Sequence, residues 1–268
     1  MATVVVLQHL LYRNAKPQYM VHAFAALWRE RGHRVVEHFG TDSPPAGDVA
    51  ILHLDLTVVP DEYRALCSRY PRVVNCGIPD ASRERYSQLL VNRASPWTGP
   101  VIVKTNANYG GRPEAFLQFL AGKAGATVEQ PPAMTGYPTF ASLAAVPPGV
   151  WEKPGLIVEQ FIPERHAKGF FLRNWLFLGN REVCYGGHSA RPQMKLRDML
   201  DPHPIPVPEE IRQWRSRLEC DFGSFDFARH GDTYVLFDVN RSPGLGPASR
   251  ERLKGHMRSL SEGLEDFL

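Results

Sequence analysis

The segment 221–244, DFGSFDFARHGDTYVLFDVNRSPG, contains the pattern that decides the fold. Residues 223–228 and 233–240 are rich in apolar side chains, and the Arg-His-Gly-Asp between them is typical of a turn, so the segment predicts a hairpin. Asp238 and Asn240 lie two residues apart on the second strand and therefore project from the same face. A carboxylate beside an amide is an oxygen donor set that suits a hard cation such as Mg²⁺.

Asp226, on the first strand of this hairpin, is the candidate for a second carboxylate ligand. Whether it shares a face with Asp238 depends on the register of the hairpin, and a single bulge reverses the answer. The alternative interpretation is a polar face exposed to solvent on an edge hairpin. That alternative must also explain the rigid Ser-Pro-Gly turn at 242–244, which ends the strand directly after this polar pair.

A second candidate segment is 101–114, VIVKTNANYGGRPE, in which Lys104 ends an apolar strand and a loop with Gly110 and Gly111 follows. Glycines let the backbone approach a polyphosphate, and the ammonium group supplies a compact positive charge. The order of residues differs from that of a Walker loop. A Gly-Gly pair after a strand is also common as a simple turn, so both interpretations remain open.

Two further strands carry charged residues among apolar ones. Residues 156–165, LIVEQFIPER, include Glu159 inside a buried run and Glu164 beyond it. In the strand 170–178, Arg173 alternates on one face with aromatic residues, where an unpaired guanidinium is costly. Its partner is therefore either an internal carboxylate or a ligand phosphate. Further along, Lys195 lies four residues after an arginine and adds either positive charge to a site or ordinary surface charge.

The order of predicted elements divides the chain into two parts. In the first hundred residues short strands at 4–7, 35–39, 49–54 and 72–75 alternate with helices near 17–32 and 63–70, as in a parallel α/β lobe. Later strands are longer, and helices are expected at 113–120, 209–218 and 248–268. We therefore expect an α/β protein with domains at 1–95 and 96–268. His53 and Asp55 follow the third strand, where open α/β sheets place ligand contacts, although loop polarity explains them equally well.

Composition excludes several classes of protein. The 268 residues are 43% apolar and 22% charged, which is the balance of a folded globular chain. A net charge of +3 is small for a dedicated nucleic-acid binder, and no apolar run approaches the roughly 20 residues that span a membrane. The N-terminus has no signal-peptide pattern, so we expect a cytoplasmic protein, and a homodimer is left open.

The spacing of the cysteines argues against two further kinds of structure. No Cys-x-x-Cys pair occurs, so neither a zinc site nor a disulfide scaffold is expected. Buried free thiols in a reducing compartment are predicted for all four residues: Cys67, Cys76, Cys184 and Cys220.

The order of the four segments resembles that of the ATP-grasp superfamily. A strand with Lys and a glycine loop comes first, then V-E-x-F-I at 158–162, an Arg-bearing strand, and finally D-F…D-V-N-x-S-P-G. The similarity is strongest to the carboxylate–amine ligase branch, which includes D-alanine–D-alanine ligase, RimK-like and glutathione synthetase-like enzymes. It extends from about residue 75 to the end and implies an ATP-grasp domain with antiparallel sheets after a preceding α/β domain.

This resemblance implies ATP and Mg²⁺ as cofactors and small-molecule or peptide carboxylates and amines as substrates, joined through an acyl phosphate. The alternatives are a phosphotransferase acting on a hydroxyl group and a nucleotide-binding protein without catalysis. Carried over residue by residue, the resemblance implies Asp226, Asp238 and Asn240 as metal ligands; Lys104, Gly110 and Gly111 at the phosphates; Glu159, Gln160, Phe161 and Ile162 at the adenine; Glu164 at the ribose; and Arg173, Arg241 and Lys195 as cations on the transferred phosphoryl group.

The chain departs from the family pattern at three places. The family often has Glu where this chain has Asp238, which is one methylene shorter. A lysine that binds nucleotide is usual where this chain has Arg83, and arginine keeps the charge without the geometry. The glycine loop is also short.

Overall fold

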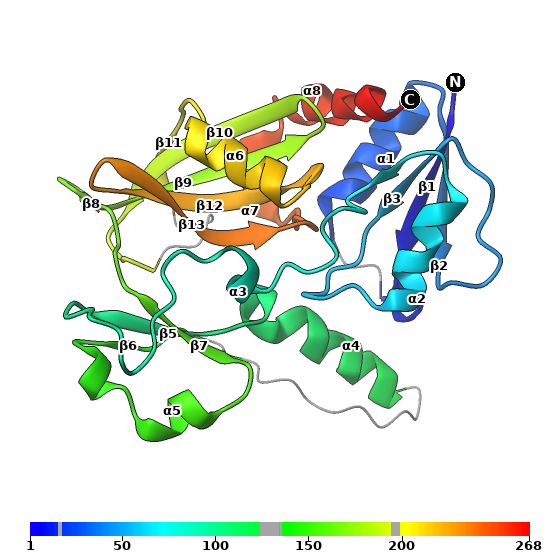
Figure 1. Ribbon diagram of the computed structural model, residues 1–268. Helices are drawn as coiled ribbons and strands as arrows, with labels where there is room; N and C mark the ends of the chain where they lie inside the picture. The colour runs from blue at the N-terminus through cyan, green and yellow to red at the C-terminus, as the bar shows by residue number, and fades with distance from the viewer. Residues whose placement is uncertain (16–17, 124–133, 135, 194–198) are drawn as a thin grey trace.

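The computed structural model describes residues 1–15, 18–123, 134, 136–193 and 199–268. Its strands form three sheets, one parallel and two antiparallel, with helices packed around them (Figure 1). This confirms the expected α/β class. The Lys195 candidate lies outside the described residues.

The N-terminal sheet is parallel, with strand order β2-β1-β3-β4. Its strands are β1 (Thr3–Gln8), β2 (Arg34–Phe39), β3 (Val49–Leu52) and β4 (Val73–Val74). After the short 3₁₀ helix η1 (Leu10–Asn14), α1 (Met20–Glu30) buries Phe24 and Trp28, and Gly32 with a φ of 87° follows its end. On the other face of this sheet, a second hydrophobic core packs against α2 (Asp61–Arg64) and the 3₁₀ helix η2 (Ala65–Arg69). The predicted alternation of strands and helices is confirmed.

The largest sheet is antiparallel, with order β11-β10-β9-β12-β13 and β8 beside β9. The strands are β8 (Arg165–His166), β9 (Gly169–Leu178), β10 (Arg181–Ser189), β11 (Leu200–Pro204), β12 (Phe222–His230) and β13 (Thr233–Asn240). Because side chains alternate along β9, Trp175 packs with α6 (Glu209–Arg217) and Leu176 packs into the core on the other face. The predicted C-terminal helix is instead three short pieces: α7 (Pro247–Leu253), α8 (Met257–Ser261) and the 3₁₀ helix η6 (Glu262–Phe267).

A small third sheet lies below the others in Figure 1. In it β5 (Val101–Thr105) pairs antiparallel with β6 (Thr139–Phe140) and β7 (Leu156–Gln160). Its helices are α4 (Arg112–Lys123), α5 (Pro148–Glu152) and the 3₁₀ helix η4 (Leu143–Ala145), and the 3₁₀ turn η3 (Asn108–Gly111) leads into α4. The single helical turn α3 (Arg83–Tyr86) lies between the N-terminal segment and this sheet in the chain.

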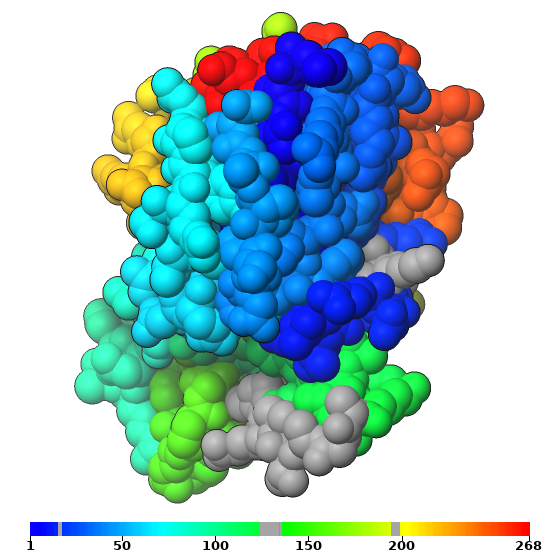
Figure 2. Space-filling view, turned by 90° about the vertical axis from the view of Figure 1, so that its right-hand side faces the viewer, coloured from blue at the N-terminus to red at the C-terminus, as the bar shows by residue number. Residues whose placement is uncertain are grey.

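Two joints connect the N-terminal lobe to the largest sheet. Trp28 Nε1 donates to the carbonyl oxygen of Ser261 over 2.7 Å, so α1 lies against α8 near the two termini (Figures 1 and 2). Asn75, with a φ of 66°, accepts from the backbone N–H groups of Asp221 and Phe222 and donates to the carbonyl oxygens of Phe222 and Arg241. All four bonds of one buried amide therefore cross between the lobes.

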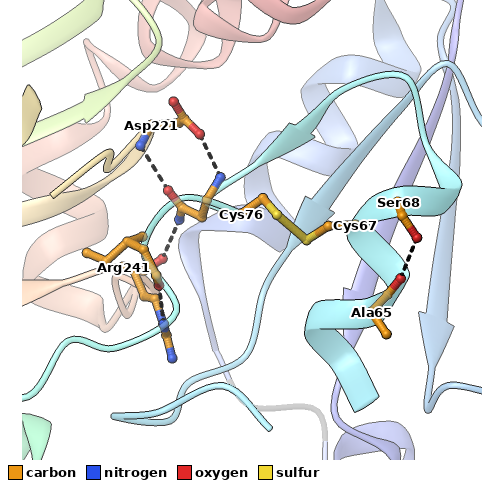
Figure 3. The surroundings of a disulfide bond; sticks show 8 residues. Ala65, Cys67, Ser68, Cys76, Asp221 and Arg241 are labelled. Carbon is orange, nitrogen blue, oxygen red and sulfur yellow. Dashed lines mark hydrogen bonds between the residues drawn. A yellow bond between two sulfur atoms is a disulfide. The ribbon is translucent and has the colours of Figure 1, made fainter. Parts of the chain in front are cut away.

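A disulfide lies directly beside this joint (Figure 3). Cys67 and Cys76 are bonded, so the prediction of free thiols is wrong for these two residues, while Cys184 and Cys220 are buried and free. The chain turns back between η2 and β4, which brings their Cα atoms to 6.3 Å, a separation within the range of disulfides. Spacing alone gave no sign of this turn. No helix in the described ranges is long and apolar enough to cross a membrane.

Candidate active site

Both antiparallel sheets and segments of the N-terminal lobe outside its strands contribute walls to one cleft of about 680 Å³. The cleft brings together ten of the residues that the sequence analysis singled out: Asp55, Arg83, Lys104, Gln160, Phe161, Ile162, Glu164, Asp226, Asp238 and Asn240. Six other candidates within the described residues do not line it: His53, Gly110, Gly111, Glu159, Arg173 and Arg241.

The hairpin register places the two candidate carboxylates side by side. In the antiparallel pair β12–β13, Asp226 lies opposite Asp238 and Ser224 lies opposite Asn240. The register shifts only beyond this point, between Asp226 and Phe227. Directly opposed residues share a face of the sheet. The side chains of Asp226, Asp238 and Asn240 therefore converge in the cleft.

The acidic pair is electrostatically unfavourable in the absence of a cation. Burial and the nearby charge of Asp238 raise the pKa of Asp226 to about 7. Its Oδ1 accepts a bond of 2.7 Å from Asn174 Nδ2, an amide on the neighbouring strand β9. Placing a divalent cation between the two carboxylates would remove this repulsion.

The donor set fits Mg²⁺ held jointly by protein and phosphate. Within the described residues no group of three or more His, Cys, Asp and Glu side chains is placed to hold a metal. Two carboxylates and an amide leave several coordination positions to phosphate oxygens and water, which is the usual arrangement for Mg²⁺. These residues therefore suit a metal that arrives with a nucleotide.

Arg83 is bound to one of the metal-ligand candidates. Its Nη2 donates to Asp238 Oδ1 over 2.7 Å, and its Nη1 donates to the carbonyl oxygen of Phe237 and to the hydroxyl of Tyr86. The Arg83 side chain is only 3% exposed, so this ion pair is largely shielded from water. The rigid guanidinium thus fixes Oδ1 of Asp238.

Lys104 and Glu159 form a buried ion pair on adjacent strands of the small sheet. Their Nζ and Oε2 atoms are 2.6 Å apart, and Lys104 Nζ lies 5.8 Å from the centre of the Phe237 ring. Burial lowers the pKa of Lys104. Burial opposes ionisation of Glu159 as well, but the charges of Lys104 and Arg83 keep the pKa of Glu159 below its usual value. Glu159 therefore positions Lys104 and does not itself line the cleft.

Five apolar side chains line one part of the cleft, called here the apolar slot: Leu89, Ile102, Phe161, Ile162 and Phe237. Three of them, Leu89, Ile162 and Phe237, pack together. The backbone N–H of Phe161 is bonded to the carbonyl oxygen of Pro100, which holds the loop that follows β7. Apolar walls suit the face of a planar heterocycle such as a purine.

The partner of Arg173 is the carboxylate of Glu164. Arg173 makes a two-point ion pair with Glu164, in which Nη2 to Oε1 is 3.0 Å and Nη1 donates to Oε2. Glu164 also accepts the backbone N–H of Arg229 over 2.6 Å. Arg173 thus has an internal carboxylate as its partner. The charges of Arg173 and Glu164 neutralise each other without a ligand.

Arg241 is a joint between the lobes. Its guanidinium donates to the backbone carbonyl oxygens of Ile78 and, over 2.5 Å, of Leu56, and the residue is 2% exposed. Burial lowers its pKa to about 10. Arg241 does not line the cleft, and its role at a transferred phosphoryl group stays a prediction.

Backbone conformation accounts for glycine at positions 110 and 111. Gly110 and Gly111 have positive φ values, 72° and 73°, which residues other than glycine rarely adopt. A Cβ at Gly110 would also lie 2.7 Å from the carbonyl oxygen of Met134. Their neighbours Tyr109 and Arg112 are the residues of this turn that line the cleft.

Replacing Arg241 by Met tests the joint. We expect the free energy of unfolding to fall by about 3 kcal/mol, because buried carbonyl oxygens lose their donor. Urea titration measures this change. Affinity for Mg-ATP, measured by calorimetry below the unfolding transition, should stay within about twofold of wild type. A large loss of nucleotide affinity in a stably folded variant would contradict this interpretation.

No protein-family model matches the sequence, and no curated protein matches it. Solved structures do. A RimK domain ATP-grasp protein from Sphaerobacter thermophilus is 13% identical, with 99% of each chain covered and a TM-score of 0.53. The macrocyclase MdnC from Microcystis aeruginosa, bound with its precursor peptide MdnA, is 10% identical, with 98% of this chain and 99% of that chain covered and a TM-score of 0.60. The chain has the ATP-grasp fold.

A third ATP-grasp structure is a RiPP-associated ligase from Chryseobacterium gregarium, in complex with ADP and a leader and core peptide. It is 9% identical, with 100% of this chain and 98% of that chain covered and a TM-score of 0.54. At such identities the similarity establishes the fold of this ATP-grasp chain. The predicted division at residues 95 and 96 and the roles of individual residues stay predictions.

Several polar residues of the ATP-grasp cleft had no role in the sequence analysis, among them Tyr19 and Asn174. An amide inside the apolar run of β9 is the signal that would have identified Asn174, since a buried polar group needs a partner. The position of Tyr19 carries no comparable signal, because it precedes α1 and meets the cleft only through the tertiary fold.

Proposed function

We propose that this protein is an ATP- and Mg²⁺-dependent ligase that joins a carboxylate to an amine through an acyl phosphate. The observation that carries the proposal is the convergence of Lys104, Asp226, Asp238 and Asn240 on one cleft that also has an apolar slot. A nucleotide with its base in that slot would direct its phosphates toward the cation and the acidic pair. Phosphoryl transfer depends mainly on such positioning and charge stabilisation.

In this reaction the substrate carboxylate attacks the γ-phosphorus of ATP, and ADP leaves. The amine then attacks the acyl carbon, the bond between that carbon and the phosphate oxygen breaks, and inorganic phosphate is released. Acyl phosphates react with water, so the site must be shielded. Support for shielding comes from the walls that the two antiparallel sheets and the N-terminal lobe contribute to the cleft.

Peptides are candidate substrates as well as small molecules. Similar structures include the macrocyclase MdnC with a precursor peptide and the ligase PsnB complexed with a minimal precursor. A side-chain carboxylate of a peptide would serve as the acid as well as a free small acid does. The alternatives are phosphotransfer to a hydroxyl group and nucleotide binding without catalysis.

The experiment is a screen of pooled acids, amines and peptides for release of ADP and phosphate, with mass analysis of the products. We expect phosphate release to require an acid and an amine together. With the acid alone, added hydroxylamine should trap an acyl hydroxamate. A stable phosphorylated hydroxyl product with no amine present would establish the phosphotransferase alternative instead, and Mg-ATP binding without turnover in every pool would favour the non-catalytic one.

A further inference from the structure

The end of the cleft nearest the N-terminal lobe contains a second acidic group. Asp55 follows β3, in the loop at the carboxyl edge of the parallel sheet, and lines the cleft together with Tyr19. The Tyr19 hydroxyl donates to Asp55 Oδ2 over 2.7 Å. Tyr19 is itself fixed by a bridge to Gly244 and by T-shaped packing on His53. The carboxylate is thus held in one orientation, with Oδ1 left for a ligand.

Ser242 supplies an independent sign of a ligand at this end. It lines the cleft, is only 2% exposed, and its Oγ has no hydrogen-bond partner among the described residues. A buried hydroxyl without a partner costs free energy. A polar ligand group in the cleft would satisfy it.

This end directly adjoins the candidate metal site. The backbone N–H of Ser242 donates to Asn240 Oδ1 over 2.9 Å. One residue back, Arg241 donates to the carbonyl oxygen of Leu56, the neighbour of Asp55. Asp55, Ser242 and Asn240 therefore follow one another along the cleft, so a group at Asp55 lies next to the place where an acyl phosphate would form.

Among the described residues Asp55 has no ion-pair partner, and the nearby guanidinium of Arg241 is bonded to backbone carbonyl oxygens. Four carboxylates line the cleft, and two of them, Glu164 and Asp238, are paired with arginines. Asp226 faces the candidate metal position, whereas Asp55 has no ion pair within the described parts of the chain. A negative group at this end repels a substrate carboxylate and attracts an ammonium group.

An apolar wall lies beside this charge. Met20, Leu172 and Leu253 line the same cleft, and all three belong to the buried core between the lobe and the largest sheet. They offer a surface for the hydrocarbon part of a ligand.

We propose that Asp55, Tyr19 and Ser242 form the subsite for the ammonium group of the amine substrate, whose apolar portion lies on Met20 and Leu253. This inference rests on the proposed ligase function and specifies its second substrate: a primary amine with an alkyl or apolar side chain. Asp55 binds the cation, Tyr19 orients Asp55, and Ser242 Oγ accepts a hydrogen bond from the ammonium group.

The test uses n-pentylamine as the probe, and calorimetry on the full chain with and without Mg-ADP. We expect n-pentylamine to bind wild type and pentanoate not to bind at this end. Asp55→Asn should raise the dissociation constant for n-pentylamine at least tenfold, as expected for loss of a charge-assisted bond. Ser242→Ala, which keeps the backbone bond to Asn240, should raise it about threefold or more. Asp61→Asn, a change of an exposed carboxylate on α2, is the matched control and should leave it unchanged.

Binding should also weaken in acid. Burial raises the pKa of Asp55 to about 6, with Tyr19 and Arg241 opposing this rise and Glu114 adding to it. Below that pH the carboxylate takes a proton and loses its attraction for the ammonium group, so affinity should fall about tenfold from pH 7 to pH 5. In Asp55→Asn this pH dependence should disappear.

Unchanged n-pentylamine affinity in both Asp55→Asn and Ser242→Ala overturns the subsite, and so does equal binding of pentanoate. If Mg-ADP still binds in that case, the proposed ligase function stands without the subsite. If wild type fails to bind Mg-ADP while n-pentylamine binding still requires Asp55, the ligase proposal falls and the amine site remains. Should Asp55→Asn fail to fold, Ser242→Ala and the wild-type pH profile decide the question.

Discussion

At pH 8, Asp226→Asn is expected to raise the free energy of unfolding by about 2 kcal/mol, whereas Asp238→Asn is expected to lower it by about 2 kcal/mol. The two substitutions are chemically identical and lie opposite each other on β12 and β13. Their effects differ because their partners differ. Chemical denaturation without metal or nucleotide measures both.

Asp226 is buried and faces a second carboxylate, with an amide of Asn174 as its hydrogen-bond donor. Asparagine removes the repulsion and still accepts that bond. Asp238 instead neutralises Arg83, whose side chain is 3% exposed. Removing the charge of Asp238 leaves this guanidinium without its closest counter-charge. The loss in free energy of unfolding is smaller than for a fully buried ion pair because the Asp238 side chain is 26% exposed.

The effect of Asp226→Asn should depend on pH in a defined direction. The pKa of Asp226 is raised from 3.8 to about 7 in the folded protein. Well below pH 3.8 the carboxyl is neutral in both folded and unfolded chains, so the variant should gain little. Between pH 4 and pH 7 the unfolded chain has ionised Asp226 while the folded chain still holds the proton, so wild type loses stability that the variant keeps. The difference between the two proteins should therefore grow from pH 4 to about pH 7 and stay constant above it.

Both variants should lose most of the extra stabilisation that Mg-ATP gives wild type, about 2.7 kcal/mol at one hundred times the dissociation constant. A thermal-shift series with ATP, Mg²⁺ and both together measures this. Equal Mg-ATP shifts in wild type and the two variants would remove both carboxylates from the metal site. A destabilised Asp226→Asn protein at pH 8 would contradict the repulsion that we infer between them.

Much of the fold follows from local sequence patterns. Short apolar runs such as Val49–Leu52 are fully buried strands, and the turn before Thr233 closes the hairpin as its residues indicate. The ordered motifs also predicted the ATP-grasp fold that the solved structures share. Such features depend on residues close in the chain, where periodicity and turn chemistry decide the outcome.

Other features of the site depend on residues far apart in the chain. The guanidinium of Arg241, whose role at a phosphoryl group stays a prediction, donates to Ile78 and Leu56, more than 160 residues away. The partner of Arg173 was open between a carboxylate and a ligand until the fold placed Glu164 beside it. Whether a charged side chain faces a cleft or a neighbouring strand is set by tertiary register, which no single segment encodes.

Lys104→Met is expected to lower the free energy of unfolding by about 3 to 5 kcal/mol, because it leaves Glu159 buried without its cation. Glu159 is 2% exposed, and the two charged atoms are 2.6 Å apart. A simple loss of nucleotide binding in this variant would therefore be ambiguous. The double variant Lys104→Met with Glu159→Gln removes both charges and should recover most of the lost stability.

If Lys104 binds phosphate, the double variant should still bind ATP more weakly than wild type, by about 1 to 3 kcal/mol or roughly 5- to 150-fold. Glu159→Gln alone is the matched control: it keeps the lysine charge, lacks the carboxylate that positions it, and should lose less ATP affinity than the double variant. Calorimetry on all three proteins, without urea and at a temperature at which each is folded, gives the comparison. Wild-type ATP affinity in the double variant would mean that Lys104 serves only to neutralise Glu159, because removing the phosphate contact would then have had no effect.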